Sequence, residues 1–290
     1  MRLQEISKTV EALISNKDAN GKSAVKNFGF LSCSDAIHIK HVPFYESCFI
    51  LVLSGRKLIF SGADTIYCDA GDVVTVPGPS SFDLRNEPDQ RTKKYKALVI
   101  PFSADMLERL GQVYFSHAER QQQPAALLKF NSDHLLHSSI EHYLRTSNDP
   151  ILLEHRLAEL LLILLRKNDA LLRYTYNRDK WSQRVRTVIA ADLTKAWKII
   201  EVSAQLITTE STLRRNLKIE GTGFRELLFE TRLSSALMRL LQTTLPVYQI
   251  AYDCGYQSVS RFSSNFRRRF GVAPTEFRSF KLETEQILTV

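Results

Sequence analysis

Short apolar runs alternate with turn-forming residues over the first third of the chain. Between residues 36 and 102 the runs are rich in Ile, Val, Phe and Tyr, and residues of the Gly, Pro, Asp and Ser types separate them. Segments such as Ser54-Gly55 and Pro77-Gly78-Pro79 supply the backbone angles that tight strand connections need. The pattern predicts strands at residues 36–42, 48–53, 57–60, 65–68, 73–76 and 96–102. Strands this short and this closely spaced are typical of a small β-sandwich or barrel.

A helical period begins at Ala104. Residues 132–145 and 152–172 are predicted to form two helices separated at Asn148-Asp149-Pro150, because proline suits the first position of a helix. Residues 173–180 are rich in Tyr, Asn and charge, and we predict that they form the linker to the next domain.

The second of these helices carries more leucine than one buried face requires. A stripe with the i, i+4, i+7 and i+8 spacing is formed by Leu153, Leu157, Leu160, Leu161 and Leu164. It is widened by Leu152, Ile163 and Leu165. This surplus either seats the helix deeper in its own domain or offers an apolar face to a second subunit. We favour the second alternative, a homodimer, with Leu165 pointing outward.

A helix-turn-helix pattern lies near the end of the chain. Residues 247–254 are predicted to form a short helix, Gly255 to turn the chain, and Ser258 to cap a second helix that runs to Phe270. On a helical wheel, one side of the second helix carries Phe262, Phe266 and Phe270. The opposite side carries Ser260, Ser263, Ser264 and Arg267. Hydroxyls and a guanidinium suit a DNA groove better than a protein core.

The same arrangement recurs 49 residues earlier, counted from Thr209 to Ser258 as the two N-caps. Residues 200–206 are the expected first helix, and Leu213 and Leu217 the buried pair of the second. The side facing away from the leucines carries Ser211, Arg214, Arg215 and Lys218. A long helix at 224–241 is predicted to join the two motifs, with an exposed stripe of Arg225, Arg232 and Arg239.

At these residues the chain resembles the AraC/XylS family of transcription regulators. The run 250–262, IAYDCGYQSVSRF, is similar to the most specific signature of the family, and Phe266, Phe270-Gly271 and Pro274 follow in register. The run 211–215, STLRR, with Arg232 and Ala236, resembles its first half. The resemblance covers roughly residues 184–278. It implies that the two recognition helices enter successive major grooves of DNA, and that the first motif carries more of the base readout.

The resemblance also indicates which side chains read bases. The matching positions are Ser211, Arg214 and Arg215 in the first motif and Val259, Ser260 and Ser264 in the second. An arginine offers a bidentate fork to guanine, Val259 suits a thymine methyl, and the short serine hydroxyls suit phosphate. The predicted DNA-binding set is completed by Lys218, Arg261, Arg267 and Arg268. For Arg267, Arg268 and Arg269 the alternative is a solvated basic face, and we expect at least one of them to contact phosphate.

One residue departs from this pattern. Ile207 occupies the turn position that Gly255 holds in the second motif. A β-branched residue is strained in the left-handed conformation that glycine adopts freely. We therefore predict that the first turn has a different shape from the second.

The N-terminal region resembles the cupin-like regulatory domain that often accompanies this DNA-binding module. Gly71 and Pro77 keep the spacing of the second cupin motif, but no His follows Pro77 within a dozen residues. His38 and His41 point to opposite faces of a strand, and His134 and His137 lack a third ligand. No metal and no other cofactor is expected. The cysteines, Cys33, Cys48, Cys68 and Cys254, have no metal-ligand spacing and are expected to be buried thiols, with a redox sensor as the alternative.

Composition and charge agree with this division. A chain of 290 residues with 44% hydrophobic and 24% charged residues is typical of an ordered protein of about two domains. We place a cupin-like regulatory and dimerisation domain at 1–175 and a DNA-binding domain at 180–285, an α+β protein overall. Residues 180–290 hold 17 Lys and Arg against 10 Asp and Glu, whereas residues 1–179 hold 22 against 21. The net charge of +7 on the C-terminal part fits a polyanionic partner.

These observations favour one class of protein over another. The favoured class is a cytoplasmic, sequence-specific regulator of transcription, because no apolar run reaches about 18 residues and the start lacks the apolar stretch of a signal peptide. Its expected partners are double-stranded DNA, RNA polymerase and a small-molecule or protein effector whose site is unknown. Family habit favours an activator. The alternative is a cupin-type metal enzyme carrying a DNA-binding tail, but no convergent metal ligands or acid–base pair support catalysis.

Overall fold

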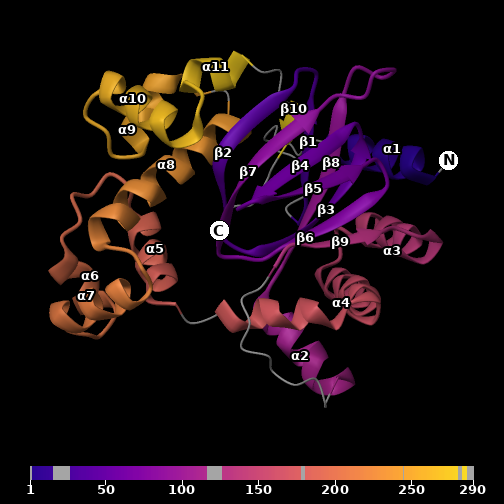
Figure 1. Ribbon diagram of the computed structural model, residues 1–290, viewed down its shortest axis with the longest axis horizontal. Helices are drawn as coiled ribbons and strands as arrows, with labels where there is room; N and C mark the ends of the chain where they lie inside the picture. The colour runs from indigo at the N-terminus through magenta and orange to yellow at the C-terminus, as the bar shows by residue number, and fades with distance from the viewer. Residues whose placement is uncertain are drawn as a thin grey trace. The chain divides into compact units, whose positions relative to one another are not determined.

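The computed structural model describes residues 2–15, 27–115, 126–177, 180–243, 245–279 and 283–285. The chain divides into two compact units (Figure 1). The β unit is drawn from Met1–His38, Pro43–Tyr176 and Phe280–Val290, and the helical unit from Ile39–Val42 and Asn177–Ser279. Within the described residues, no helix has the length and apolar character needed to cross a membrane.

Two sheets form the centre of the β unit. The larger has the strand order β10-β1-β8-β3-β6-β9, and the smaller has the order β2-β7-β4-β5. The bounds are β1 Gly29–Cys33, β2 Ile37–Phe44, β3 Ser47–Ser54, β4 Arg56–Ser61, β5 Asp64–Asp69, β6 Asp72–Val76, β7 Ser80–Glu87, β8 Tyr95–Phe102, β9 Leu128–Asn131 and β10 Glu283–Glu285. The two antiparallel sheets agree with the β domain expected from the sequence, and each of the six predicted strands is present. Strands β1, β7, β9 and β10 lie outside the predicted set.

The central strand β3 is buried on both of its faces. Phe49, Leu51 and Leu53 point to the side covered by helices and belong to the main hydrophobic core. The alternating residues Ile50 and Val52 are also buried, on the face of the sheet opposite the helices. This double cover explains why the strand reads as an unbroken apolar run rather than an alternating one.

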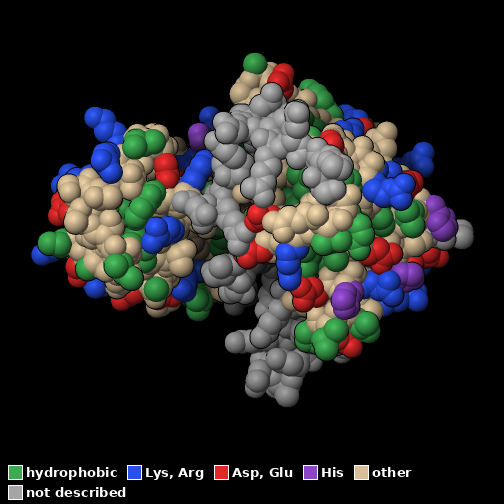
Figure 2. Space-filling model, turned by 90° about the horizontal axis from the view of Figure 1, so that it is seen from below, with side chains coloured by type: hydrophobic (Ala, Val, Ile, Leu, Met, Phe, Trp, Pro, Cys, Tyr) green, Lys and Arg blue, Asp and Glu red, His purple; other side chains and the backbone are tan. Residues whose placement is uncertain are grey.

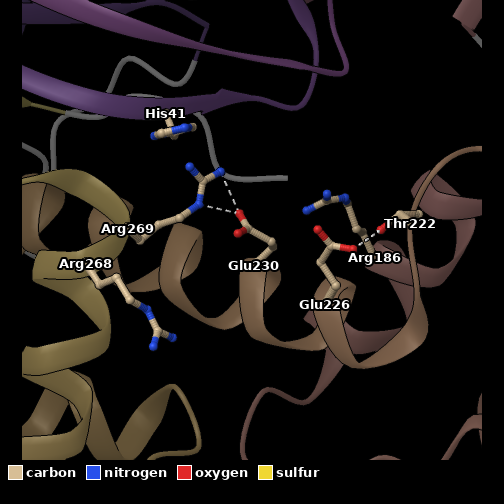
Figure 3. A pocket seen from close by; sticks show the side chains of 7 residues that line it. All are labelled: His41, Arg186, Thr222, Glu226, Glu230, Arg268 and Arg269. Carbon is tan, nitrogen blue, oxygen red and sulfur yellow. Dashed lines mark hydrogen bonds and ion pairs between the residues drawn. The ribbon is translucent and has the colours of Figure 1, made fainter.

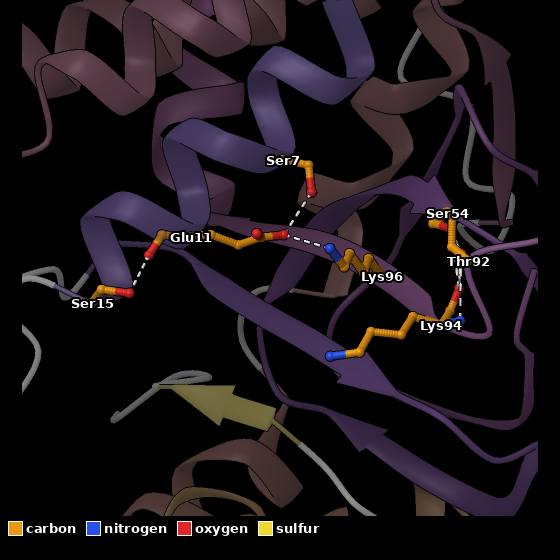
Figure 4. Close-up of polar contacts among 7 residues, drawn as sticks. All are labelled: Ser7, Glu11, Ser15, Ser54, Thr92, Lys94 and Lys96. Carbon is orange, nitrogen blue, oxygen red and sulfur yellow. Dashed lines mark hydrogen bonds and ion pairs between the residues drawn. The ribbon is translucent and has the colours of Figure 1, made fainter.

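Helices cover one face of the larger sheet (Figure 1). Their bounds are α1 Arg2–Ser15, α2 Ala104–Tyr114, α3 His134–Arg145, α4 Pro150–Lys167 and the 3-10 helix η1 Asp169–Asn177. Pro150 is the first residue of α4, as predicted, and the Asp149 side chain accepts hydrogen bonds from the amides of Ile151 and Leu152. Helix α1 was not predicted. Its Glu11 pairs with Lys96 of β8 at 2.6 Å and accepts a hydrogen bond from Ser7 (Figure 4).

Two predictions about α4 and the segment after it were wrong. Leu165 does not point outward, because it is 1% exposed and packs in the core with Leu161 and Leu164. The exposed apolar residues of this helix lie at its start instead, where Ile151 is 72% and Leu152 is 46% exposed. The surplus leucines therefore serve the core of a helix that is covered on more than one side.

The segment 173–180 is not a linker throughout. Tyr174 is buried, and its hydroxyl lies 2.9 Å from the Thr75 carbonyl oxygen and 2.7 Å from that of Ala126. These contacts fix η1 to strand β6 and to the segment just before β9, so the β unit extends through this residue. The polar composition of the segment gave no sign that Tyr174 is anchored in the core.

All four cysteines are buried and unpaired, as expected. Burial raises the pKa of the Cys33 and Cys68 thiols to about 11, and that of Cys48 and Cys254 to about 12. A thiol reacts with oxidants as its thiolate, and a raised pKa makes the thiolate scarce at neutral pH. These side chains consequently suit packing better than redox sensing.

Candidate nucleic-acid interface

The second helix-turn-helix motif is built as the sequence predicted. Helix α9 spans Val247–Asp253 and helix α10 spans Val259–Phe270. Between them Gly255 has a φ of 77°, and the Ser258 side chain caps α10 by accepting a hydrogen bond from the Arg261 amide. The cap and the turn together fix the angle at which α10 leaves the turn.

The first motif has the same components. Helix α6 spans Ile199–Gln205 and helix α7 spans Glu210–Ile219. The Thr209 hydroxyl caps α7 by accepting a hydrogen bond from the Thr212 amide at 3.2 Å. As predicted, Leu213 and Leu217 are fully buried and hold the helix against its own unit.

The first turn has the same backbone as the second, so the prediction of a different shape was wrong. Ile207 adopts a φ of 53°, in the left-handed region. The amides of Leu206, Ile207 and Thr208 donate to the carbonyls of Val202, Ala204 and Ser203. The amides of Cys254, Gly255 and Tyr256 make the corresponding bonds to Ile250, Tyr252 and Ala251. Three backbone hydrogen bonds outweigh the steric preference of one side chain.

An aromatic cluster buries one face of α10. Phe262, Phe266 and Phe270 are fully buried, and their neighbouring ring centroids are 5.6 and 4.6 Å apart. Tyr256 packs on Phe262 from the turn side, and Phe277 packs on Phe266 from the last helix, α11 Pro274–Ser279. Because this face is committed to the core, the opposite face of α10 is left to solvent.

The exposed faces of α7 and α10 are polar and basic. Most of the side chains that the sequence placed there are exposed, whereas Val259 and Ser263 are half-buried. The exposed ones are Ser211, Arg214, Arg215, Lys218, Ser260, Arg261, Ser264, Arg267 and Arg268. In the space-filling view, Lys and Arg side chains recur over the visible surface of the helical unit, with acidic groups between them (Figure 2). The helical wheel therefore separated the buried and exposed faces correctly.

The basic side chains differ in how firmly they are held. Arg214 pairs with Glu210 at 2.6 Å, and Arg267 lies 3.4 Å from Glu276. Arg268 donates to Asn265 at 3.1 Å and lies over the ring of Phe229. Arg215 makes no hydrogen bond or ion pair among the residues described. The Lys218 and Arg261 side chains likewise make none among the described residues, so these three cationic groups are the most available for a ligand.

Arg269 is set apart from its two neighbours. Its guanidinium pairs with Glu230 at 2.6 Å, and its side chain is only 15% exposed (Figure 3). Burial lowers the pKa of Arg269 and raises the pKa of Glu230. The residue fastens α10 to the long helix α8, Phe224–Gln242, and is not free to contact a phosphate.

The predicted arginine stripe along α8 was wrong for two of its three members. Helix α8 runs between the two motifs (Figure 1). Arg225 is exposed, but Arg232 donates to the carbonyls of Leu193 and Lys195 at 3.0 and 2.9 Å. Arg239 pairs with Asp253 of α9 at 3.2 Å. The last two therefore brace the scaffold that positions the recognition helices.

One anchoring contact gave no signal in the sequence. Helix α5, Trp181–Ala191, packs against α6, α7 and α8. Its first amides, those of Trp181 and Ser182, donate to the Glu220 carboxylate at 2.6 and 2.9 Å. A carboxylate at a helix N-terminus is favourable because the unpaired amides there carry partial positive charge. Glu220 follows α7, so this contact ties the end of the first recognition helix to α5.

Comparisons with known proteins agree with both units. Residues 202–279 match the family described as "Helix-turn-helix domain", and residues 47–174 match the "ExsA N-terminal regulatory domain". The urease operon transcriptional activator of Escherichia coli is 33% identical over 135 residues, 46% of this chain and 45% of the relative. The HTH-type transcriptional regulator GadX of Escherichia coli O6:H1 is 35% identical over 95 residues, 33% of this chain and 35% of GadX. The aligned stretch is thus less than half the length of each of these relatives.

Solved structures show the fold over a longer stretch. The crystal structure of ToxT from Vibrio cholerae with a bound unsaturated fatty acid has a TM-score of 0.64 and 19% identity, covering 88% of this chain and 94% of ToxT. A ToxT structure bound to (E)-4-(8-methylnaphthalen-1-yl)but-3-enoic acid gives a TM-score of 0.65 at the same identity, covering 88% and 99%. An antiparallel β domain followed by a helical domain with two helix-turn-helix motifs is the shared architecture.

Proposed function

This chain belongs to the AraC/XylS family of helix-turn-helix proteins, and from that premise we propose that it is a transcription regulator that binds DNA sequence-specifically through α7 and α10. One observation carries the proposal. Each recognition helix has a fully buried apolar face and, opposite to it, an exposed face of hydroxyl and basic groups. Such a helix fits the major groove, where base edges and phosphates offer complementary acceptors.

The side chains divide into base-reading and backbone-contacting groups. Arg214 and Arg215 lie beside Ser211 on α7 and present guanidiniums to guanine, and Val259 on α10 presents a methyl-binding surface to thymine. The remaining members of the set are expected to contact phosphate or sugar: Lys218, Ser260, Arg261, Ser264, Arg267 and Arg268. The helical unit supplies these contacts, and its net positive charge supports association with DNA.

The β unit is proposed to control the activity of the helical unit. The match to a family described as a regulatory domain supports this role, and so does the ToxT-like fold, since ToxT structures contain an unsaturated fatty acid and a substituted butenoic acid. The effector is a small molecule or a protein. The urease operon relative is an activator by name, so we propose activation, with RNA polymerase as a partner and the cytoplasm as the site of action.

A homodimer forms through the helices of the β unit in this proposal. The surface differs from the one expected from the sequence, because Leu165 is buried. Ile151 and Leu152 are exposed at the start of α4, and α2, which packs beside α4, exposes Val113 and Tyr114. Large apolar side chains exposed on neighbouring helices are typical of an interface.

The enzyme alternative receives no support from the described residues, which contain no group of three or more His, Cys, Asp or Glu side chains able to hold a metal ion. Metal analysis of the purified protein tests this alternative directly. A stoichiometric iron, manganese or zinc content would favour it over the regulator.

The proposal is tested by selecting duplexes from a randomised DNA library with the full chain and measuring affinity at two salt concentrations. We expect enrichment of one sequence with two contacted segments about 10 base pairs apart, because successive major grooves on one face of DNA have that spacing. Affinity for the selected duplex should fall steeply with salt. An unenriched library, or an affinity that salt does not change, would contradict the proposal.

A further inference from the structure

Ile207, in the turn of the first motif, is energetically unfavourable in the free protein for two reasons. Its φ of 53° lies in the left-handed region, which is strained for a β-branched residue. Its side chain is also 95% exposed, so a large apolar group stands in water. Neither cost is offset by packing among the described residues. A residue that is unfavourable in the free protein on both counts points to a role in a complex.

The backbone of this turn does not depend on the side chain. The amides of Leu206, Ile207 and Thr208 all donate to carbonyls at the end of α6. The carbonyl of Leu206 accepts a hydrogen bond from Arg184 of α5 at 3.4 Å. The turn is therefore held from both sides, and glycine would fit the same conformation with less strain.

The equivalent turn in the second motif has different surroundings. A Cβ on Gly255 would lie 2.3 Å from the Leu193 carbonyl oxygen and 2.8 Å from the Arg232 guanidinium, so a side chain is excluded there. The Ile207 side chain is not confined by neighbouring atoms in this way and projects into solvent. The two turns share a backbone, but only the first offers a side chain to a partner.

The location of Ile207 indicates what that partner is. The residue stands two positions before Thr209, the cap of α7, whose hydroxyl lies 3.1 Å from that of Ser211. In helix-turn-helix proteins the N-terminal residues of the recognition helix contact base edges in the major groove. Ile207 therefore lies at the end of α7 that would enter the groove. The apolar group that DNA displays in the major groove is the C5-methyl of thymine.

We propose that Ile207 is a specificity-determining residue that packs against a thymine methyl at the edge of the site read by α7. The inference rests on the proposed DNA-binding function. A contact of this kind removes the Ile207 side chain from water. Because only thymine carries the methyl group that buries it, the contact discriminates thymine from the other bases.

The test uses the full chain and a duplex that it selects from a randomised library. Each thymine of the selected site is replaced in turn by uracil, which lacks the methyl group but pairs identically. For the unaltered protein, one such replacement should weaken binding about fourfold, the effect of losing one buried methyl group. For Ile207→Gly and Ile207→Asn, the same replacement should have no effect, and their affinity for the thymine duplex should be at least about fourfold lower.

A matched control separates this contact from general effects of an exposed isoleucine. Ile219→Ala changes another exposed isoleucine, at the opposite end of α7, and should respond to every uracil replacement as the unaltered protein does. Thermal unfolding of Ile207→Gly and Ile207→Asn should show no loss of stability, since glycine and asparagine tolerate the left-handed conformation.

The outcomes distinguish this inference from the function on which it rests. If the unaltered protein enriches no duplex, the proposed function fails. If it enriches a duplex but the Ile207 variants keep full affinity and full sensitivity to uracil, DNA binding stands and the thymine contact is overturned. Full DNA affinity combined with lost transcription activation would also overturn it, and would assign Ile207 to a protein contact.

Discussion

The Arg232 guanidinium packs directly against Gly255 in the turn of the second motif, since a Cβ placed on Gly255 would lie 2.8 Å from the Nη2 atom of Arg232. The same guanidinium donates to the carbonyls of Leu193 and Lys195. One side chain of the linking helix α8 thus joins the segment between α5 and α6 to the turn that orients α10. Position 255 therefore requires glycine both for its left-handed backbone and for the close approach of Leu193 and Arg232.

Gly255→Ala should therefore be more damaging than an ordinary substitution of a left-handed glycine. It adds a steric conflict with Leu193 and Arg232 to the backbone strain, and we expect a loss of about 2 to 4 kcal/mol in the free energy of unfolding. Gly221→Ala is the matched control, because Gly221 has a φ of 74° but nothing within 4 Å of an added Cβ. It should cost about 1 kcal/mol. Equal costs in urea denaturation would show that both the Leu193 carbonyl and the Arg232 side chain move aside freely.

The arginines of α7 and α10 should differ in the kind of binding they lose. Arg215→Ala is expected to cost about 1 to 3 kcal/mol at the selected site and to relax the base preference at one position, because its guanidinium is unpaired among the described residues and suits guanine. Arg214→Ala should have a similar but smaller effect, since Arg214 already pairs with Glu210. Arg267→Ala should weaken all sequences about equally and reduce the salt slope by roughly one ion.

Affinities for single-base variants of the site, measured at two salt concentrations, separate these cases. Arg269→Ala serves as the comparison for a structural arginine, because it breaks the pair with Glu230 and should lower stability before it changes any preference. If neither Arg214→Ala nor Arg215→Ala alters the preference at any base, α7 does not read bases through these side chains.

The dimer surface can be tested at two exposed residues of α4. Ile151→Glu combined with Leu152→Glu should yield folded monomers, because both side chains are exposed and a carboxylate is favourable in the first turn of a helix. Leu165→Glu is the opposite case, since it places a carboxylate in the core and should unfold the β unit. Sedimentation velocity reports the oligomeric state of each variant, and circular dichroism reports whether it is folded. An unchanged sedimentation coefficient for the double variant would place the interface elsewhere, or show that the protein is a monomer.

Much of the fold could be predicted because its apolar positions repeat with the period of the element they occupy. The strands β3 to β6 and β8 stood out by their β-branched and aromatic runs between turn residues. Strand β7 did not, because its sequence SSFDLRNE carries only two apolar residues. Helix α4 showed its stripe, but periodicity cannot count the neighbours that cover a helix, and Leu165 was misplaced for that reason.

The candidate site was predictable where local spacing decides and unpredictable where distant contacts decide. The exposed faces of α7 and α10 follow from the positions of the buried Leu and Phe residues alone. The role of Arg232 depends on carbonyls 37 and 39 residues earlier in the chain. The backbone of Ile207 depends on hydrogen bonds from α6, which override the preference of its side chain. Tertiary contacts of this kind leave no periodic trace in a sequence.

Lys57 is a buried lysine whose side chain has a single hydrogen-bond acceptor among the described residues. Its side chain is 2% exposed in the β unit and donates to the Asn86 side-chain oxygen at 2.7 Å. Burial lowers the pKa of Lys57 to about 8, against about 10.4 in an unfolded chain. Between these values the unfolded chain binds the proton and the folded chain does not, so stability rises with pH across this window. Below pH 8 the buried charge costs roughly 3 kcal/mol.

Lys57→Met should remove this dependence. As the pH rises from 7 to 10, the free energy of unfolding of the unaltered protein should increase by about 2 to 3 kcal/mol relative to that of the variant. Burial raises the pKa of the nearby Cys33, Cys48 and Cys68 thiols to about 11 or 12, above this pH range, so they stay largely protonated in both folded proteins. The loss of the Asn86 contact adds an offset that does not vary with pH. Lys8→Met, which removes an exposed lysine of α1, is the control and should show a constant difference. A constant difference for Lys57→Met as well would mean that Lys57 stays protonated in the folded protein throughout this range.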